Sequence, residues 1–322
     1  MTLPIQQRGF SILELLIALG LGLMLTAGVV IVFVQNHRSA VQDEEIARVL
    51  ENGRYLVRIL SREMAMSGYW GKFLDVGITT NHASVVIDQD CGDGINPWAM
   101  ELDAIQFLNN VTTVTTAATF ECLPSANIVV GSDIIAIKRV ADSETADASL
   151  QTNQIYMRTN AVAATMFLGG AVGTPPAMTG TVVNWSYRPQ VYFLRNYSFN
   201  PADGIPSLCR GFLDNSSPPD MITECLIEGV ENLQIEFGVD DDDDFIADYY
   251  TGSPTPAELF DSVSCRIHVL LRSLKPIPNY INDKTYKMGS VNIAAANDGF
   301  FRRVFSTTVL LRNPANLARL GS

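Results

Sequence analysis

The sequence predicts an α+β fold in which a long N-terminal membrane-spanning helix packs against an antiparallel β-sheet domain. The first observation behind this prediction is a run of 25 residues, from 10 to 34, in which Glu14 is the one charged side chain. The second is an apolar face that continues at helical spacing to about residue 64. The third is the remainder of the chain, where short segments of strand character are separated by turns and no internal repeat occurs.

The apolar run is long enough to cross a membrane. As a helix it would extend about 37 Å, against roughly 30 Å for the hydrocarbon core of a bilayer. A secretory signal would have a shorter apolar region followed by a small-residue cleavage site, whereas this run passes directly into helix-compatible sequence. We therefore expect a retained membrane helix, in which the Glu14 carboxylate is costly unless it snorkels, is protonated or meets a cationic partner.

Beyond the membrane the same helix is expected to continue to about residue 67. Its second half has one apolar face, which we expect to pack on the globular domain. The residues of this face are Ile46, Val49, Leu50, Gly53, Val57, Leu60 and Met64. Arg54, Arg58 and Arg62 follow one another on a different face, where we expect a solvated or acid-paired surface.

The rest of the chain is expected to form one domain, a sheet laid against the end of the helix. The clearest strand covers residues 263–273, where Val263, Cys265 and Ile267 alternate with polar side chains, as in a half-buried antiparallel strand. The other expected strands are residues 84–88, 104–108, 133–140, 191–197, 232–237 and 303–311. Residues 112–119, 169–176 and 216–219 are expected to be loops.

Composition and motifs argue against nucleic-acid binding and against catalysis. The chain has 322 residues, with 22 Lys and Arg against 34 Asp and Glu, for a formal net charge of -12. Such an acidic surface is a poor partner for phosphate backbones, so no direct nucleic-acid site is expected. The chain contains three histidines and no G-x-S-x-G, H-E-x-x-H, P-loop or dinucleotide fingerprint. We therefore expect no catalytic residues and no enzymatic activity.

Residues 8–14 (RGFSILE) and the apolar residues after them resemble the class III signal of type IV prepilins and type II secretion pseudopilins. In that family a prepilin peptidase cuts after the glycine and methylates the new amino terminus. The resemblance implies cleavage between Gly9 and Phe10, N-methylation of Phe10, and an assembly role for Glu14. An amine and a carboxylate are both costly in lipid unless they pair, so Glu14 of one subunit would meet the terminal amine of its neighbour.

The later sequence narrows the resemblance to the PilW-like minor pilins. It rests on residues 229–240 (GVENLQIEFGVD), 266–273, 301–309, 67–71 (SGYWG) and 91–94 (CGDG). It implies a pilin-like fold. We divide the chain accordingly into a prepilin leader peptide (1–9), a transmembrane and assembly helix (10–36), an amphipathic continuation of the helix (37–68) and a periplasmic pilin-like β-rich domain (69–322).

The resemblance also implies a function in type IV pilus assembly. The chain would be a minor pilin that primes or caps the filament, and it would thereby take part in twitching motility, adhesion or DNA uptake. Its expected partners are other minor pilins, the major pilin, a tip adhesin, the prepilin peptidase and the inner-membrane assembly machinery. It would be a single-pass inner-membrane protein with a periplasmic C-terminal domain, and after assembly it would lie at or near the pilus tip. The alternatives are a J-like minor pseudopilin of type II secretion and, from another class, a membrane-anchored periplasmic adhesin or hydrolase.

Five cysteines permit fifteen two-bridge pairings. Cys209 and Cys225 flank a loop rich in Pro, Ser and Asp that has little else to order it, so they are the favoured bridge. Cys265 lies on the apolar face of its strand, which suits a buried thiol. Cys91 and Cys122 then remain as the second pair by elimination.

The acidic run at residues 240–244 raises the possibility of a calcium site. Asp240, Asp242, Asp244 and Asp248 occupy positions 1, 3, 5 and 9 of an EF-hand-like loop, a spacing that lets oxygen ligands converge on one cation such as Ca²⁺. Phe245 stands where that loop has glycine, and Thr251 stands where it has a bidentate glutamate. Calcium loops in related pseudopilins favour the site, and a solvated acidic turn between two strands is the alternative.

Overall fold

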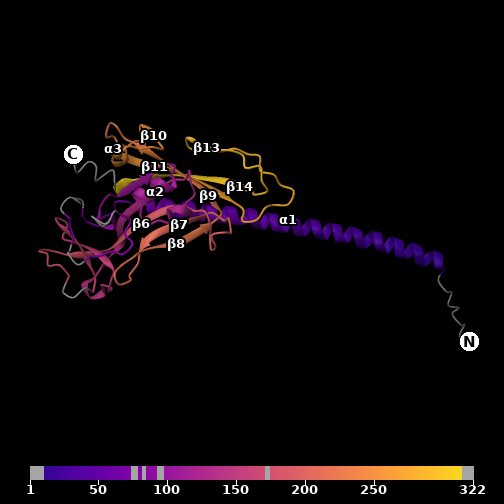
Figure 1. The fold of residues 1–322 in the computed structure, drawn as a ribbon, viewed down its shortest axis with the longest axis horizontal. Coiled ribbons are helices and arrows are strands. Elements are labelled where there is room, and N and C mark those ends of the chain that lie inside the picture. Colours follow the sequence, from indigo (N-terminus) through magenta and orange to yellow (C-terminus); the bar gives the residue numbers. More distant parts are fainter. Residues whose placement is uncertain (1–10, 74–78, 82–84, 93–97, 171–174, 314–322) are drawn as a thin grey trace, which may run out of the picture.

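The computed structural model describes residues 11–73, 79–81, 85–92, 98–170 and 175–313, and one long helix projects from its β-rich body (Figure 1). This helix, α1 (Ile12–Met66), has 55 residues and a length of about 82 Å. Ser11 is its N-cap, and at the other end the Ser67 hydroxyl donates a hydrogen bond to the Met64 carbonyl. The prediction of one continuous helix from the apolar run to residue 67 is confirmed.

The elements after α1 are mostly strands, joined by turns and a few short helices. In chain order they are β1 (Thr79–Asn81), η2 (Trp98–Met100), β2 (Ile105–Leu108), α2 (Thr113–Thr119), η3 (Ser125–Asn127), β3 (Ile134–Thr145), η4 (Asp147–Ser149), β4 (Ile155–Thr159), β5 (Ala164–Leu168), β6 (Val183–Arg195), β7 (Ser207–Leu213), β8 (Met221–Glu228), β9 (Val230–Val239), β10 (Tyr249–Thr251), α3 (Pro256–Phe260), β11 (Ser262–Arg272), β12 (Tyr286–Met288), β13 (Val291–Ile293) and β14 (Arg302–Leu310).

Eight strands form what we call the large sheet. Its order is β1-β5-β4-β6-β3-β2, and β7 pairs with β6 and with β8. The short pair β1–β5 is parallel, and the other pairs are antiparallel. β6 is central because β3 pairs with one of its sides, while β4 and β7 pair with successive stretches of the other side.

Four strands form the small sheet, in the antiparallel order β10-β9-β11-β14. A separate hairpin, β12–β13, completes the strand pairing. In β11 the side chains of Cys265, Ile267 and Val269 are buried, as the alternating sequence pattern predicts.

The second half of α1 contributes to a core shared by both sheets. The helix contacts β14 and β11 of the small sheet and β3 of the large sheet. The core joins Val49, Leu56, Leu60 and Met64 of the helix to Ile135, Ile137 and Tyr192 of the large sheet and to Ile235, Ile267, Val269 and Val309 of the small sheet. Burying this stripe holds the helix on the body, since each buried aliphatic side chain contributes roughly 1.5–3 kcal/mol.

The other face of the large sheet has its own apolar packing. Side chains alternate along β3, so Ile135 faces α1 while Ile134 and Ala136 belong to a second core that includes Cys91 and Cys209. A third core surrounds Trp70, Phe73, Trp185 and Tyr187, just beyond the end of α1.

Three details of the predicted fold were wrong. The body contains more than one sheet, because β2, β3 and β6 of the predicted strands pair in the large sheet whereas β9, β11 and β14 pair in the small sheet. Strands β4, β5, β7 and β8, which extend the large sheet, were not predicted. Residues 112–119, predicted as a loop, contain helix α2, which the side chains of Thr112 and Thr115 cap reciprocally. The strand predicted at 84–88 is reduced, in its described residues, to a single bridge between Asp88 and Asp220.

Candidate functional sites

At the start of α1, Glu14 bonds to its own helix terminus. Its carboxylate accepts a hydrogen bond from the backbone N–H of Ser11 at 3.2 Å, and the Ser11 hydroxyl accepts one from the Leu13 N–H at 3.3 Å. This capping arrangement satisfies donors that the beginning of a helix leaves unpaired. Gly9 and Phe10, where cleavage and methylation are predicted, lie outside the described residues.

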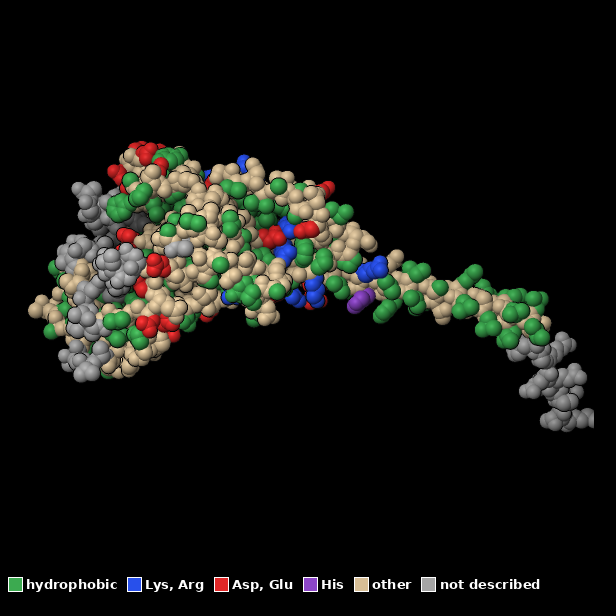
Figure 2. Space-filling model, viewed as in Figure 1, with side chains coloured by type: hydrophobic (Ala, Val, Ile, Leu, Met, Phe, Trp, Pro, Cys, Tyr) green, Lys and Arg blue, Asp and Glu red, His purple; other side chains and the backbone are tan. Residues whose placement is uncertain are grey.

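No part of the described chain covers the first half of α1. Every side chain from residue 11 to residue 40 is exposed, and apolar side chains cover the projecting helix (Figure 2). Such a surface is stable in lipid or against other apolar helices rather than in water. By length and composition α1 could cross a membrane.

The far end of α1 is held to the large sheet by a buried ion pair between Glu63 and Arg139 of β3. Arg139 Nε donates to Glu63 Oε2 at 2.9 Å and Nη2 donates to Oε1 at 3.0 Å, which is the bidentate arrangement. The Glu63 side chain is 12% exposed and the Arg139 side chain is 6% exposed. The pair therefore joins helix and sheet where water screens it little.

A second carboxylate fixes α1 where it enters the body. Glu45, buried on α1, accepts hydrogen bonds from the backbone N–H groups of Leu274 and Lys275 at 3.0 and 3.3 Å, just after β11. Glu45 and Glu63 are about five helical turns apart, so they lie on the same side of the helix. Between them Gly53 lies against the ring of Phe305, and a Cβ at this position would overlap that ring.

Sequence reasoning missed this junction. The predicted apolar face contained Val49, Gly53 and Leu60, which are buried, but neither Glu45 nor Glu63 was assigned to it. A signal was present, because both glutamates fall on the side of the helix marked by the apolar stripe, where an unpaired charge would be costly.

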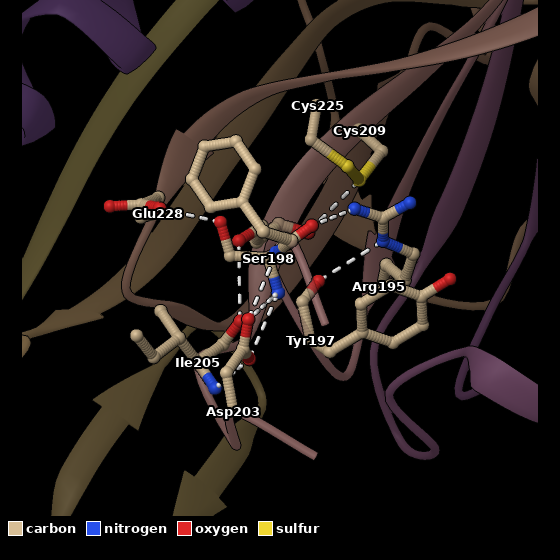
Figure 3. The surroundings of a disulfide bond; sticks show 10 residues. Arg195, Tyr197, Ser198, Asp203, Ile205, Cys209, Cys225 and Glu228 are labelled. Carbon is tan, nitrogen blue, oxygen red and sulfur yellow. Dashed lines mark hydrogen bonds between the residues drawn. A yellow bond between two sulfur atoms is a disulfide. The ribbon is translucent and has the colours of Figure 1, made fainter. Parts of the chain in front are cut away.

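The structure joins Cys209 to Cys225, directly opposite each other on β7 and β8. Figure 3 shows this disulfide beside the loop after Arg195, with the Asp203 carboxylate directed at the backbone of that loop. Asp203 accepts hydrogen bonds from the N–H groups of Ser198, Phe199, Asn200 and Ile205. Desolvation opposes ionisation, but these four donors lower the pKa of Asp203 to about 2.

The structure also joins Cys91 to Cys122 and leaves Cys265 as a buried free thiol. Cys91 and Cys209 lie in the same core, so both disulfides brace the face of the large sheet opposite α1. Burial raises the pKa of Cys265 to about 12, which keeps the thiol protonated and unreactive.

The acidic run forms the connection between β9 and β10 and brings three of the predicted calcium ligands together. Carboxylate oxygens of Asp240, Asp242 and Asp244 lie within 4.8 Å of one another. The pKa of Asp242 is raised, chiefly by the neighbouring Asp244 carboxylate. Oxygen ligands grouped in this way suit a hard cation such as Ca²⁺, which would relieve the repulsion.

The rest of an EF-hand loop is only partly reproduced. Phe245 has φ of 69°, the left-handed conformation that the glycine of such a loop usually provides, and its N–H donates to Asp240 at 2.8 Å. Asp248 lies outside the group of three and instead accepts a hydrogen bond from the Asp241 N–H at 2.8 Å. Thr251 lies in β10, paired with β9. The residues present fit a three-carboxylate site rather than a regular EF-hand.

The histidines occupy separate surroundings. His37 lies on the exposed part of α1, and His82 lies outside the described residues. His268 on β11 has Nδ1 at 2.8 Å from Ser306 Oγ and Nε2 at 3.6 Å from a carboxylate oxygen of Glu236. Burial lowers the pKa of His268 despite that carboxylate, which favours a neutral imidazole linking β11 to β14.

Comparisons with known proteins gave one family match and a structural match. Residues 191–313 match the model of the family PilW, described as Type IV Pilus-assembly protein W. Among solved structures, a type IV-like pilin from Thermus thermophilus aligns with a TM-score of 0.40 and 10% sequence identity, covering 83% of this chain and 97% of that chain. A comparison with curated protein sequences gave no match.

Proposed function

Residues 191–313 match the PilW family of type IV pilus-assembly proteins, and from this premise we propose that the chain is a minor pilin that primes or caps the pilus together with other minor pilins. The observation that carries the proposal is the exposed apolar half of α1, which continues into a body whose residues 191–313 match this pilus-assembly family. A helix of this kind needs either a bilayer or a bundle of similar helices around it.

The proposal places the chain in the inner membrane before assembly and near the pilus tip afterwards. In the membrane, the first half of α1 spans the bilayer once and the body lies in the periplasm. In the filament, the same apolar surface packs against the helices of other minor pilins and of the major pilin. The prepilin peptidase, the inner-membrane assembly machinery and a tip adhesin complete the proposed set of partners.

Glu14 would fix the axial position of this subunit relative to its neighbours during assembly. In the isolated chain its carboxylate bonds to the Ser11 N–H at the helix terminus. After cleavage, the methylated amine of Phe10 from a neighbouring subunit would offer a cation to that carboxylate. A subunit displaced along the filament axis would leave an amine and a carboxylate unpaired in an apolar bundle, which is strongly unfavourable.

Deleting the gene tests the assembly role. We expect fewer surface pili and less twitching motility, while the major pilin remains present in the membrane. Maturation should require prepilin peptidase, whereas an anchored adhesin or hydrolase would not depend on it. Loss of protein secretion with normal piliation would favour the J-like pseudopilin, and a deletion strain with normal piliation would contradict the proposed function.

A further inference from the structure

A notch interrupts one side of the central strand of the large sheet. β4 pairs with β6 at residues 183–186 and β7 pairs with the same side at residues 190–195. Between these two pairings, on the same side of β6, no described strand pairs with residues 187–189. Pro189, which lacks an N–H to donate, lies in this gap. A cavity of about 370 Å³ opens at the notch, large enough for a small ligand.

The cavity is cationic although the chain as a whole is acidic. Arg188 and Arg210 line it, together with the amide side chains of Gln154, Gln190 and Asn215. The formal net charge of the chain is -12, so a pocket with two guanidinium groups departs from its surroundings.

The arginines are incompletely neutralised by the described part of the chain. Arg188 is exposed and makes no ion pair or side-chain hydrogen bond there. Arg210 donates to Glu224 through Nη2, but its buried Nε has no acceptor. Asp214, the carboxylate that also lines the cavity, accepts hydrogen bonds from Ser216 and from the backbone of Asp220.

The register of the large sheet indicates what the cavity binds. Arg188 of β6 lies directly opposite Arg139 of β3, on the same face of the sheet. Arg139 is neutralised by Glu63, a carboxylate carried by α1. Two like charges directly opposite each other are destabilising, and one of these two lacks a counter-charge.

We propose that the notch binds a carboxylate carried by a neighbouring pilin subunit, which pairs with Arg188 and Arg210 as Glu63 pairs with Arg139. The proposal rests on the proposed function, since a filament is what brings a second subunit beside α1. The planar guanidinium forks suit a carboxylate because they donate two parallel hydrogen bonds to it.

Glutarate, which presents the carboxylate of a glutamate side chain, is the probe for the pocket. The full chain in detergent at low salt is titrated by calorimetry, as wild type and as Arg188→Gln. We expect the Kd of the variant to rise about tenfold, since a charged bidentate contact is lost. The matched control is Arg58→Gln, which removes the same charge from an exposed site on α1 and should leave the Kd within about twofold.

Arg188 is exposed and its charge lies opposite that of Arg139, so its substitution should not lower the thermal midpoint, and the binding result stays interpretable. Absence of glutarate binding to the wild type, or an equal Kd for Arg188→Gln, would overturn the proposal. Binding of inorganic phosphate in place of glutarate would overturn the assignment of a carboxylate. The gene deletion tests the proposed function separately. If deletion abolishes pili while Arg188→Glu piliates normally, the docking role fails and the assembly role stands.

Discussion

Removing the charge of Glu63 should detach α1 from the large sheet more effectively than any exposed substitution nearby. In the wild type, Glu63 receives two hydrogen bonds from Arg139, and the two side chains are 12% and 6% exposed. Glu63→Gln keeps the size of the side chain but leaves the guanidinium charged and unpaired in a nearly dry site. Breaking a buried pair from one side in this way costs about 3–5 kcal/mol. That is a large part of the roughly 5–15 kcal/mol that stabilises an ordinary domain.

Denaturant unfolding of the full chain in detergent measures this loss. The three tryptophans, Trp70, Trp98 and Trp185, are all buried in the body, so their fluorescence reports its unfolding. The midpoint should shift while the denaturant slope stays constant, since the surface exposed on unfolding is unchanged.

The neighbouring residue provides the control. Arg62 pairs with Asp142, and these side chains are 69% and 63% exposed, so Arg62→Gln should cost less than about 1 kcal/mol. Replacing both partners, as Glu63→Leu with Arg139→Met, should recover most of the loss, because no buried charge is left unpaired. The buried pair does not hold α1 to the sheet in this way if Glu63→Gln costs no more than Arg62→Gln, or if the double variant loses as much stability as the single one.

Four further predictions follow from individual contacts. Gly53→Ala should lower the free energy of unfolding by about 1–3 kcal/mol, because the added methyl group would overlap the ring of Phe305. Gly28→Ala is the control, since no atom lies within 4 Å of a Cβ there, and it should not destabilise the body in chemical unfolding. Burial raises the pKa of Asp133 to about 7, so the protonated side chain should contribute its full stability below about pH 4, and this contribution should be lost as the pH rises through 7. The free energy of unfolding measured against pH should therefore decline less steeply in Asp133→Asn than in the wild type. Millimolar calcium should raise the thermal midpoint relative to chelator, and Asp242→Asn should remove the shift; a wild-type midpoint indifferent to calcium leaves only an acidic turn. Non-reducing peptide mapping should find Cys265 unlinked, and any disulfide to it would contradict the assignment.

The helix was predictable because its signals are local. An apolar run with one charge and an amphipathic continuation both act within a few turns, and α1 ends at Met66, next to the predicted stop. The strand at β11 was predictable for the same reason, since apolar and polar residues alternate from Val263 to Val269. The calcium site was predicted from the spacing of the aspartates and from the family resemblance, and the structure brings three of the four named carboxylates together.

The missed features depend on partners distant in sequence or, for helix α2, on capping hydrogen bonds rather than on composition. Glu63 and Arg139 meet across 76 positions, and nothing local to either residue reports the other. Helix α2 is rich in threonine, a residue with low helix propensity, so its capping hydrogen bonds matter more than its composition. The notch at Pro189 exists because β4 and β7 end on either side of it, which is a property of sheet topology rather than of any one segment.

Glu14 is proposed to position this subunit among the helices of a pilus, and counting surface pili by electron microscopy measures whether it does. Cells carrying Glu14→Leu are compared with cells carrying Glu51→Leu, which alters an exposed glutamate in the second half of the same helix. Removing a charge from the apolar segment should leave membrane insertion intact or improve it. We expect fewer pili for Glu14→Leu, with the protein present in the membrane, and normal pili for Glu51→Leu. Normal piliation with Glu14→Leu would show that Glu14 does not have this positioning role.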